Sequence, residues 1–316
     1  MRVELLAELL NARSLPPAKD CPVHYDAVLI TGPTASGKSA LSLDLGALWP
    51  AANIAVDSAL VYRSMDIGTA KPSAAEQALM PHYGMDLIDP AQRYSVAQFL
   101  ADAQAGIDHA RAVGRMPLLV GGTMMYVNAL YQGLSPLPAG DAAIRVQIEG
   151  RAANVGWPAL HAELVGVDPN TAARLAPNDA QRIERALEVY HATGKPLSAW
   201  LAQTQASPAL ISKGRWLHLS IEPPRNTIWQ RVANRFDTML DSGFLDEVAE
   251  LRARGDLDEN LPSIRCVGYR QAWQHLAGEL SYAEFRERAV IASRQLAKRQ
   301  MTWLRGMEQR VVVVPN

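Results

Sequence analysis

The stretch that decides the fold is residues 27–39, AVLITGPTASGKS. Its first part, residues 27–30, is a short apolar run that predicts a buried strand, and a helix is predicted from Lys38 to Leu48. Between them, residues 32–39 match the pattern G-x4-G-K-[ST] in full. Such a loop turns consecutive backbone N–H groups toward phosphate oxygens, and the N-terminus of the helix adds partial positive charge. The stretch therefore predicts a phosphate-binding loop at the edge of a parallel sheet.

The loop pattern identifies a phosphate ligand but leaves the reaction open. The eight residues of this candidate site are Gly32, Pro33, Thr34, Ala35, Ser36, Gly37, Lys38 and Ser39. In such loops the lysine reaches the terminal phosphate and the serine hydroxyl holds Mg²⁺. Most chains with this loop bind ATP or GTP, but the sequence contains no N-K-x-D guanine-reading motif, which argues against a GTPase switch. A small-metabolite or nucleoside kinase that binds ATP stays open at this point.

Strand and helix patterns alternate along the chain around this loop. Short apolar runs predict further buried strands at residues 53–56, 117–120, 216–221 and 311–314. Helical periodicity predicts helices at residues 95–113, 225–241, 243–254, 268–277 and 281–305. Continuous apolar strands that alternate with helices are typical of a parallel sheet covered on both faces. The sequence therefore predicts the α/β class.

The pattern changes in the middle of the chain. Residues 134–140, LSPLPAG, form a proline-rich break, and residues 141–206 show helical patterns without a strand run. We therefore expect a helical insertion domain at 141–206 within a core catalytic domain made of residues 25–140 and 207–316. Residues 1–24 begin with a short amphipathic pattern, and we expect them to form an N-terminal extension outside the core.

Composition excludes several classes of protein. The 316 residues are enough for about two domains, and 31 basic against 32 acidic residues give a net charge of −1, so net charge does not indicate a nucleic-acid partner. Two distant cysteines, Cys21 and Cys266, rule out a disulfide framework and a four-cysteine metal site. No apolar run approaches the ~20 residues of a membrane span, and Glu4 and Glu8 interrupt the leucines of the N-terminus. We expect a cytoplasmic protein that does not bind membranes.

Asp57 is the first candidate for proton transfer. It directly follows the strand predicted at residues 53–56 and lies 18 residues after Ser39. Ligands of open α/β sheets bind at the carboxyl edge of the strands, so this carboxylate is placed to accept a proton from a nucleophile beside the phosphates. Two other roles stay open from position alone, namely a cap for the following segment or a ligand of Mg²⁺ only.

Six blocks of sequence together resemble the signature of the tRNA dimethylallyltransferases, also called tRNA isopentenyltransferases or IPP transferases, of the bacterial type. The blocks are residues 32–39, 57–72 (DSALVYRSMDIGTAKP), 94–96 with Phe99, 121–126 (GGTMMY), 264–270 (IRCVGYR) and 298–305 (KRQMTWLR). They occur in the order typical of that family and span most of the chain. The resemblance implies a P-loop NTPase-like core with an all-helical insertion.

The resemblance also implies an activity. It is the transfer of a dimethylallyl group from dimethylallyl diphosphate to N6 of adenosine 37, beside the anticodon, in tRNAs that read codons beginning with U. The products would be i6A37 and diphosphate. In that family the phosphate-binding loop holds the prenyl diphosphate rather than ATP. The expected partners are therefore dimethylallyl diphosphate and the anticodon stem-loop of tRNA, with Mg²⁺ as cofactor and a monomeric enzyme.

Roles for individual residues follow from the same resemblance. The residues expected to take part in the reaction are Asp57, Thr123, Lys38 and Ser39. The aspartate is the expected general base, and the threonine contacts the bridging oxygen of the diphosphate or the acceptor. The lysine and the serine, with Mg²⁺, stabilise the leaving diphosphate. Arg231 or Arg235 adds charge from a predicted helix, and the sequence does not choose between them.

The residues expected to contact tRNA fall into four groups. They are Asp57, Ser58, Ala59, Leu60 and Thr123 beside the acceptor; Arg145, Gln181, Arg182, Ile183, Glu184 and Arg185 in the insertion; Arg265, Cys266, Val267, Gly268, Tyr269 and Arg270; and Lys298, Arg299, Gln300, Met301, Thr302, Trp303, Leu304 and Arg305. Basic residues with an interleaved aromatic residue suit phosphate contact and base stacking. Without the resemblance, the last group would be interpreted as a solvated helical face with Trp303 in the core, and the insertion group as an ordinary amphipathic helix.

Two other functions stay open on the sequence. A phosphate-loop kinase would turn over ATP with a small acceptor, whereas a prenyltransferase would not consume ATP. A non-catalytic RNA-binding protein that uses the loop as a nucleotide sensor would consume neither donor. The fate of the loop's ligand therefore separates the three hypotheses.

Overall fold

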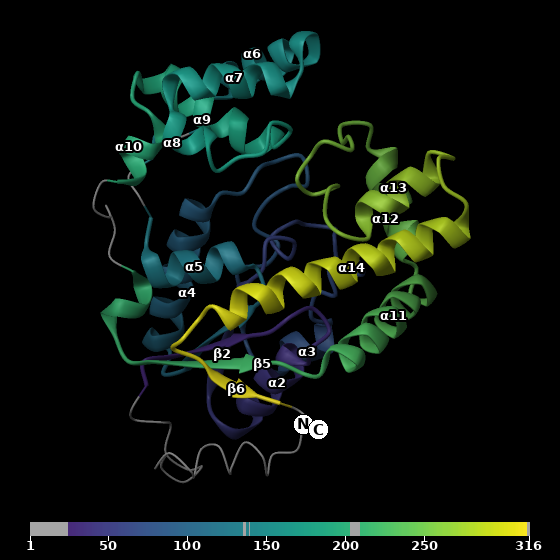
Figure 1. Cartoon of the computed structure of the whole chain (residues 1–316). Coiled ribbons are helices and arrows are strands. Elements are labelled where there is room, and N and C mark those ends of the chain that lie inside the picture. The colour runs from purple at the N-terminus through teal and green to yellow at the C-terminus, as the bar shows by residue number, and fades with distance from the viewer. Residues whose placement is uncertain (1–24, 135–136, 139, 203–208, 315–316) are drawn as a thin grey trace. The chain divides into compact units, whose positions relative to one another are not determined.

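The computed structural model describes residues 25–134, 137–138, 140–202 and 209–314 (Figure 1). The chain divides into two compact units, which we call unit 1 (residues 1–131 and 210–316) and unit 2 (residues 132–209). The helical segment expected at 141–206 falls within unit 2, whose bounds are wider at both ends. The expected N-terminal extension, residues 1–24, lies outside the described residues.

The described part of unit 1 contains one sheet of six strands, which all run parallel. The strands are β1 (Ala27–Thr31), β2 (Ala51–Val56), β3 (His82–Tyr83), β4 (Met116–Gly121), β5 (Trp216–Ile221) and β6 (Val311–Val313), in the order β3-β2-β4-β1-β5-β6. This arrangement confirms the predicted α/β class. The strand β3 was not predicted, because two residues are too short to show a periodic pattern.

Alternate residues of β1 pack on opposite faces of the sheet. Val28 and Ile30 contribute to a core that also contains Leu41 and Leu45 of α2 (Lys38–Leu48). Ala27 and Leu29 face a second core, which contains side chains of α4 (Val96–Ala112) and α5 (Met124–Gln132). A strand buried on both faces is apolar at every position, which is the pattern that residues 27–30 show.

A third core holds the remaining long helices of unit 1. These are α11 (Arg225–Asp241), α12 (Phe244–Ala253), α13 (Tyr269–Leu276) and α14 (Tyr282–Arg305), and they pack with Val61, Tyr62 and Met65 from the segment after β2. The helix α14 packs against α11 (Figure 1). Its start is fixed by a capping box, in which the Ser281 hydroxyl accepts from the N–H of Glu284 and the Glu284 carboxylate accepts from the N–H of Ser281. The short elements α3 (Ala74–Leu79) and η1 (Leu210–Lys213) complete the described part of unit 1.

The strand order reverses at β1, and this reversal locates the ligand site. Both β2 and β4 lie on one side of β1, whereas β5 and β6 lie on the other. In open α/β sheets, ligands bind outside the carboxyl ends of the strands at such a switch point. The segment predicted to bind phosphate, residues 32–39, follows β1 at this point.

The regular secondary structure of the described part of unit 2 is all helical. Its helices are α6 (Ala142–Val155), α7 (Trp157–Val167), α8 (Pro169–Ala172), α9 (Ala180–Thr193) and α10 (Leu197–Leu201). They share a core of their own, in which Ile148, Leu164 and Ile183 are buried. No helix in the described part of either unit is long and apolar enough to cross a membrane.

Candidate active site

A cavity of about 550 Å³ lies at the carboxyl edge of the sheet, and all of its lining residues belong to unit 1. Its walls come from the segments after β1, β2 and β4, from α11 and α14, and from the residues before α13. The charged residues that line it are Lys38, Asp57, Arg235, Arg265 and Arg299. Its volume is in the range of small-molecule sites. The structure therefore gathers residues from five of the six predicted blocks around one space.

The phosphate-binding loop has the backbone that its glycines permit. Gly37 has a φ of 98°, in the left-handed region, and forms the N-cap of α2. At Gly32 a Cβ atom would lie only 2.5 Å from the Ser36 Oγ and 2.7 Å from the Ile221 carbonyl oxygen, so no larger residue fits. Ala35 also has a positive φ, of 61°. The loop is therefore held in a tight turn that opens onto the cavity.

The ammonium group of Lys38 lies in a site that disfavours its charge. Burial and, to a lesser extent, the positive charge of Arg235 lower the pKa of Lys38 to about 8, against the opposing effect of Asp57. The Lys38 Nζ donates a long hydrogen bond to the Pro33 carbonyl, at 3.4 Å. Burial disfavours the charge of this ammonium, and its hydrogen bond to Pro33 is long. An anionic ligand would stabilise the charged form, so Lys38 is well suited to bind one.

Asp57 both caps a turn and lines the cavity. Its Oδ1 accepts a hydrogen bond from the N–H of Ala59 at 2.9 Å, so the capping role considered from sequence is real. The carboxylate is also close enough to Lys38 and Arg235 to raise the pKa of each, against the effect of burial. Capping uses one oxygen and does not remove the carboxylate from the cavity.

Thr123 joins the segments that follow β2 and β4. Its Oγ1 accepts from the N–H of Ser58 at 3.0 Å and donates to the Ser58 Oγ at 3.3 Å. Its own N–H donates to the Val56 carbonyl at 3.2 Å. These bonds place the threonine hydroxyl beside the residue that follows Asp57, and both residues line the cavity.

The structure distinguishes the two arginines of α11 that the sequence left as alternatives. Arg235 lines the cavity, where burial lowers its pKa and Asp57 opposes that effect. Arg231 is not a lining residue, and its Nη1 instead donates to the Ser36 carbonyl at 3.4 Å, on the phosphate-binding loop. Arg235 is therefore placed to meet a ligand, and Arg231 supports the loop that would hold it.

The block at residues 265–270 contributes to the wall of the cavity. Arg265, Cys266, Val267, Gly268 and Tyr269 are lining residues, whereas Arg270 is exposed outside it. Burial and, to a lesser extent, the charge of Asp57 raise the pKa of the Cys266 thiol to about 12, so the thiol stays protonated. A protonated thiol is a poor nucleophile, and Cys266 therefore acts as part of the wall.

Residues 298–305 divide between the cavity, the core and the surface. Arg299, Gln300 and Trp303 line the cavity. Met301 and Leu304 are buried, and Lys298, Thr302 and Arg305 are exposed. Trp303 is 50% exposed, so the alternative that placed it in the core is wrong. The buried side chains of Met301 and Leu304 face the packing of α14 and are not available to an RNA.

The basic residues of unit 2 are engaged within that unit. The fully buried carboxylate of Glu188 accepts from the Arg145 Nε at 2.8 Å and from the Arg185 Nη1 at 2.6 Å. Arg182 pairs with Asp179 and is 72% exposed at its side chain. The remaining predicted residues of this group differ in exposure: Gln181 is exposed, Glu184 is partly buried and lies 3.7 Å from the Arg145 Nε, and Ile183 is fully buried.

Sequence reasoning missed Glu247 of α12, which organises one wall of the cavity. Its carboxylate accepts from the N–H groups of Asp66, Ile67 and Gly68, at 2.8, 2.7 and 3.2 Å, and from the Tyr269 hydroxyl at 2.6 Å. Gly68 and Tyr269 both line the cavity. An acidic residue in the first turn of a helix is common and shows no pattern that would single out Glu247. The three backbone N–H groups that it binds lie about 180 residues earlier in the chain.

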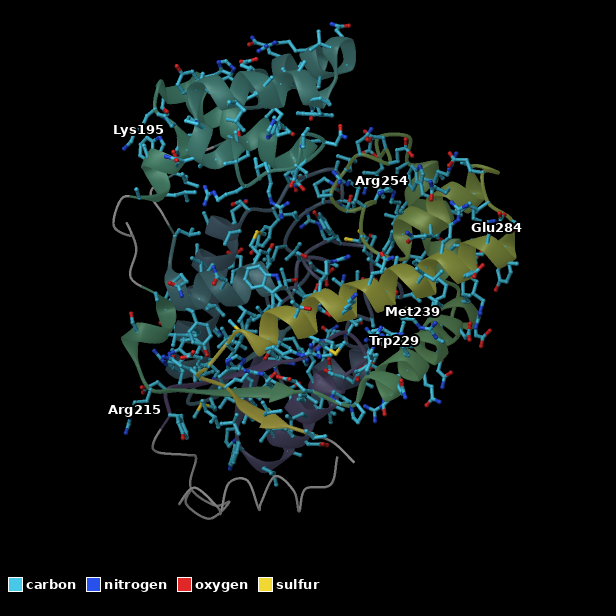
Figure 2. The ribbon with its side chains drawn as sticks, viewed as in Figure 1. Lys195, Arg215, Trp229, Met239, Arg254 and Glu284 are labelled. Carbon is cyan, nitrogen blue, oxygen red and sulfur yellow. The ribbon has the colours of Figure 1, made fainter. Side chains whose placement is uncertain are left out.

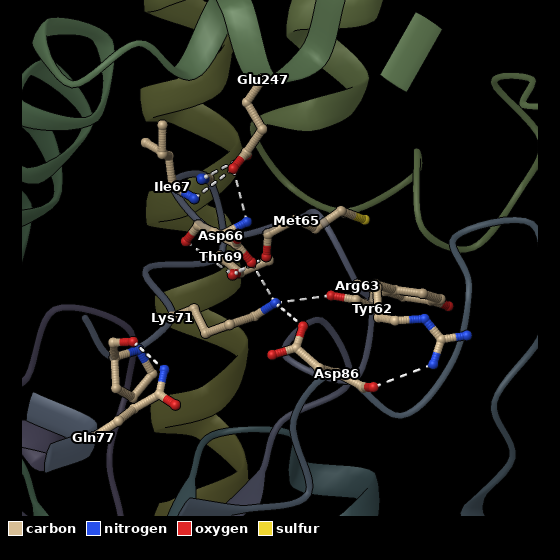
Figure 3. A network of polar contacts seen from close by, with 12 residues as sticks. Tyr62, Arg63, Met65, Asp66, Ile67, Thr69, Lys71, Gln77, Asp86 and Glu247 are labelled. Carbon is tan, nitrogen blue, oxygen red and sulfur yellow. Dashed lines mark hydrogen bonds and ion pairs between the residues drawn. The ribbon is translucent and has the colours of Figure 1, made fainter. Parts of the chain in front are cut away.

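Lys71 completes this support from the other side of the same segment. Its side chain is only 4% exposed, and Nζ donates to the Tyr62 carbonyl at 2.9 Å and to the carboxylates of Asp66 and Asp86 (Figure 3). Figure 3 also shows Glu247 above the turn at residues 66–67. Hydrogen bonds and ion pairs from Glu247 and Lys71 therefore hold the backbone of residues 62–68 in place.

The oxygen ligands of the cavity suit Mg²⁺. Among the described residues, no group of three or more His, Cys, Asp or Glu side chains is arranged to hold a metal ion. Mg²⁺ does not need such a group, because one or two protein oxygens bind it together with substrate phosphates and water. Ser39, whose hydroxyl is exposed, and Asp57 line the same cavity. These residues fit an ion that binds together with a diphosphate.

Comparison with known proteins gives one consistent result. The model of the IPP transferase family matches residues 60–307. A tRNA dimethylallyltransferase of Ralstonia nicotianae is 57% identical over 291 residues, which cover 91% of this chain and 90% of the relative. A tRNA dimethylallyltransferase of Bordetella petrii is 57% identical over 287 residues, or 90% of this chain and 91% of the relative.

Two solved structures are similar over most of the chain. A full-length tRNA isopentenylpyrophosphate transferase of Bacillus halodurans gives a TM-score of 0.64 at 33% identity, covering 91% of this chain and 89% of that protein. A eukaryotic dimethylallyltransferase acting on tRNA gives a TM-score of 0.75 at 25% identity, covering 91% of this chain and 73% of that protein. The predicted family is confirmed, and with it the P-loop NTPase-like form of the core. On its fold, its six blocks and these similarities, the chain belongs to the IPP transferase family.

Proposed function

We propose that this protein transfers the dimethylallyl group of dimethylallyl diphosphate to N6 of adenosine 37 in tRNAs that read codons beginning with U. The relatives above, which are named for dimethylallyl or isopentenyl transfer to tRNA, support the proposal. The observation that carries it is the single cavity lined by Lys38, Asp57 and Thr123. A phosphate-binding loop and a carboxylate at one site suit the transfer of a group from a diphosphate to a weak nucleophile.

The donor lies with its diphosphate at the loop and its carbon chain against apolar side chains. The backbone N–H groups of the loop, Lys38 and Arg235 surround the diphosphate. Val232, Phe236 and Met239 of α11 line the same cavity and face the five-carbon chain (Met239 is labelled in Figure 2). A diphosphate beside Lys38 favours the charged ammonium, against the burial that lowers the pKa of this lysine.

The reaction requires catalysis both at the nucleophile and at the leaving group. The N6 amine of adenine is a poor nucleophile, because its lone pair is conjugated with the purine. The Asp57 carboxylate accepts a proton from N6 while N6 forms a bond to C1 of the prenyl group. The bond from C1 to the diphosphate oxygen breaks, and its electron pair leaves with the diphosphate, whose charge Lys38 and Arg235 stabilise. The Thr123 hydroxyl contacts either the bridging oxygen of the diphosphate or the acceptor adenine.

Mg²⁺ is the proposed cofactor, and Ser39 is its proposed protein ligand. When bound, the ion neutralises charge on the diphosphate oxygens. ATP shares the chemistry of the loop's ligand, so it is expected to compete with the donor without being consumed.

The acceptor is proposed to reach the cavity as a flipped base. A base inside a helical stack cannot reach an enclosed site, and its removal from the stack requires a few kcal/mol. Trp303 and Arg299 at the end of α14 combine an aromatic face with positive charge beside the cavity. We propose that they receive the anticodon loop, and that the protein acts as a cytoplasmic monomer.

One assay tests the proposal directly. The purified protein is incubated with tRNA, dimethylallyl diphosphate and Mg²⁺, and the tRNA nucleosides are analysed by mass spectrometry. The expected product is adenosine that has gained one five-carbon unit. The same mixture with ATP in place of the prenyl donor is expected to form no ADP, and acceptor-dependent ADP formation would support a kinase instead.

Two substitutions test the assigned roles. Asp57→Asn removes the proton acceptor and is expected to lower kcat by about 10²–10⁴-fold, with little change in tRNA affinity. Lys38→Ala is expected to weaken binding of dimethylallyl diphosphate as well as turnover. Asp241→Asn, which changes an exposed carboxylate at the end of α11, is the matched control and should keep wild-type kcat. A near-normal kcat in Asp57→Asn would reduce Asp57 to the capping role.

A further inference from the structure

The side chain of Gln300 is placed between the two halves of the proposed site. Gln300 belongs to α14 and is 7% exposed. Its Oε1 accepts from the N–H of Thr34, on the phosphate-binding loop, at 2.8 Å. Its Nε2 donates to the carbonyl of Gly122, directly after β4, at 2.7 Å. A residue that sequence reasoning grouped with the tRNA contacts is therefore bonded to the loops at the base of the cavity.

We propose that Gln300 is a positioning residue for the transfer reaction, which fixes the phosphate-binding loop at one distance from the segment that carries Thr123. The inference rests on the proposed function and concerns the alignment of donor and acceptor. Thr123 follows Gly122 in the chain and bonds Ser58, the residue after Asp57. One continuous set of bonds therefore runs from the loop that holds the diphosphate, through Gln300, to the residues beside the acceptor.

The fit around Gln300 leaves little freedom for either loop. A Cβ atom added at Gly122 would lie 2.6 Å from the Gln300 Nε2 and 3.0 Å from the Gly32 carbonyl oxygen. The two backbones and the amide are thus in close contact. If the amide were removed, the Thr34 N–H and the Gly122 carbonyl would each lose a partner, and the spacing between the loops would no longer be set.

Only a side chain with one donor and one acceptor at this reach satisfies both loops. A methionine has a similar length but offers no donor and only a weak acceptor. An ionised glutamate would accept from Thr34 but would direct a second acceptor toward the Gly122 carbonyl. A protonated glutamate has one O–H donor and one carbonyl acceptor, and it therefore reproduces the bonding of the amide. These differences separate a positioning role from simple packing.

The first experiment compares Gln300→Met with the wild type. Because a misaligned pair of reactants loses rate rather than binding, kcat at saturating tRNA and dimethylallyl diphosphate is expected to fall about 10- to 100-fold. The Kd for tRNA is expected to stay within about twofold, since both polar atoms of the amide are bonded to backbone groups of the protein. Hydrogen exchange of the peptide covering residues 32–39 is expected to become faster. Gln295→Met, at an exposed site on the same helix, is the control and should match the wild type in all three measurements.

The second experiment uses Gln300→Glu across pH 6–8.5. Burial raises the pKa of the introduced carboxyl, whereas the cations that line the cavity (Lys38, Arg235, Arg265 and Arg299) oppose this effect and Asp57 adds to it. As the pH falls and the carboxyl gains its proton, the ratio of variant to wild-type kcat is expected to rise. Gln295→Glu should give a ratio that does not change with pH.

The outcomes distinguish this inference from the proposed function. The inference is tested only where the wild type transfers the prenyl group. Gln300 is not a positioning residue if Gln300→Met then keeps the wild-type kcat. The same follows if this variant loses tRNA affinity by as large a factor as it loses kcat. A ratio for Gln300→Glu that stays flat with pH would also contradict the bonding role of the amide. A wild-type protein that binds dimethylallyl diphosphate but transfers nothing would overturn the proposed function, and this inference with it.

Discussion

The arginines of unit 2 and the basic residues of α14 differ in what they already contact. In unit 2, Arg145 and Arg185 bond the buried carboxylate of Glu188. On α14, the exposed side chains of Lys298, Arg299 and Arg305 form no ion pair with any residue that the structure describes. The sequence alone gave both groups the same expected partner.

The difference shows that a count of basic residues does not measure a surface's readiness to bind RNA. An arginine that neutralises a buried carboxylate cannot turn to a phosphate without leaving that carboxylate unpaired. An exposed and unpaired cation releases counterions when it meets a phosphate and gains affinity from that release. We therefore expect substitutions in unit 2 to act mainly on stability, and substitutions on α14 to act mainly on binding.

The largest expected effect is on the stability of unit 2. Glu188→Gln removes the charge that holds Arg145 and Arg185, and breaking a buried ion pair from one side typically destabilises a protein by about 3–5 kcal/mol. Hydrogen exchange of α6 and α9 is expected to become faster, while binding of dimethylallyl diphosphate is unchanged, because no described residue of unit 2 lines the cavity. Glu149→Gln, at an exposed site on α6, is the control. Unchanged exchange in Glu188→Gln would show that the two arginines do not depend on this carboxylate.

Mild acid is expected to affect unit 1 before unit 2. In unit 1, burial lowers the pKa of His218 from 6.5 to about 4, helped by the charge of Arg310, and the ring is bonded to the Thr31 and Tyr131 hydroxyls. The folded protein keeps this ring neutral while the unfolded chain binds a proton, so stability is full above pH 6.5 and falls by about 3 kcal/mol as the pH decreases toward 4. In unit 2, hydrogen bonds from Arg185, Arg145 and the Asp141 N–H outweigh burial and lower the pKa of Glu188 below 4.5, so its contribution is lost only in stronger acid.

Hydrogen exchange at pH 7.5, 6 and 5 tests this order. Amides of β1 and β5 are expected to lose protection, relative to the intrinsic exchange rate, before those of α9. His218→Gln should remove much of the dependence between pH 6.5 and 5, whereas His109→Gln, at an exposed site on α4, should leave it unchanged. Equal loss of protection in the two units would contradict the role given to His218.

A smaller effect is expected from the cations of α14. Lys298→Ala and Arg305→Ala each remove one exposed charge outside the cavity. Each is expected to weaken tRNA binding several-fold at low salt and to reduce the salt dependence of the affinity by about one counterion. The kcat at saturating tRNA should not change. Binding measured at several salt concentrations checks this, and an unaltered salt dependence would place the RNA elsewhere.

The smallest effect is expected from Arg182→Ala in unit 2. This side chain pairs with Asp179 at the surface, and such pairs typically contribute about 0–1 kcal/mol to stability. Its loss should change both the unfolding free energy and the tRNA affinity less than Lys298→Ala changes the affinity. If Arg182→Ala weakens tRNA binding as much as Lys298→Ala does, the distinction between the two groups fails and unit 2 supplies phosphate contacts.

The elements with strong local patterns were predicted well. Residues 216–221 and 225–241 form a strand and a helix with the predicted bounds, and Ser95 caps α4 as expected. The strand β3 and the helix α5 were missed, since the first has two residues and the second begins directly after the Gly-Gly-Thr turn, without a separate start signal. A periodic pattern of apolar residues needs several residues to be visible, and a helix that has no N-cap signal is hard to separate from the preceding turn.

The candidate site was predicted in its residues but not in its internal bonds. The phosphate-binding loop was named from its motif, Asp57 from its place after a strand of a parallel sheet, and Thr123 from the family resemblance. The contacts of Gln300 and Glu247 depend on segments that are far apart in the chain and meet only in the folded protein. The burial of Ile183, Met301 and Leu304 likewise follows from helix packing, which a motif does not describe.

Because the cavity is lined by unit 1 alone, the two units can be altered separately. Since every lining residue belongs to unit 1, the sequence of unit 2 can vary while the lining residues stay the same. A chimaera that carries unit 2 of a relative would keep each of these residues. Exchange of unit 2 is therefore expected to alter the stability of that unit while the residues of the cavity, and with them the chemistry, stay in place.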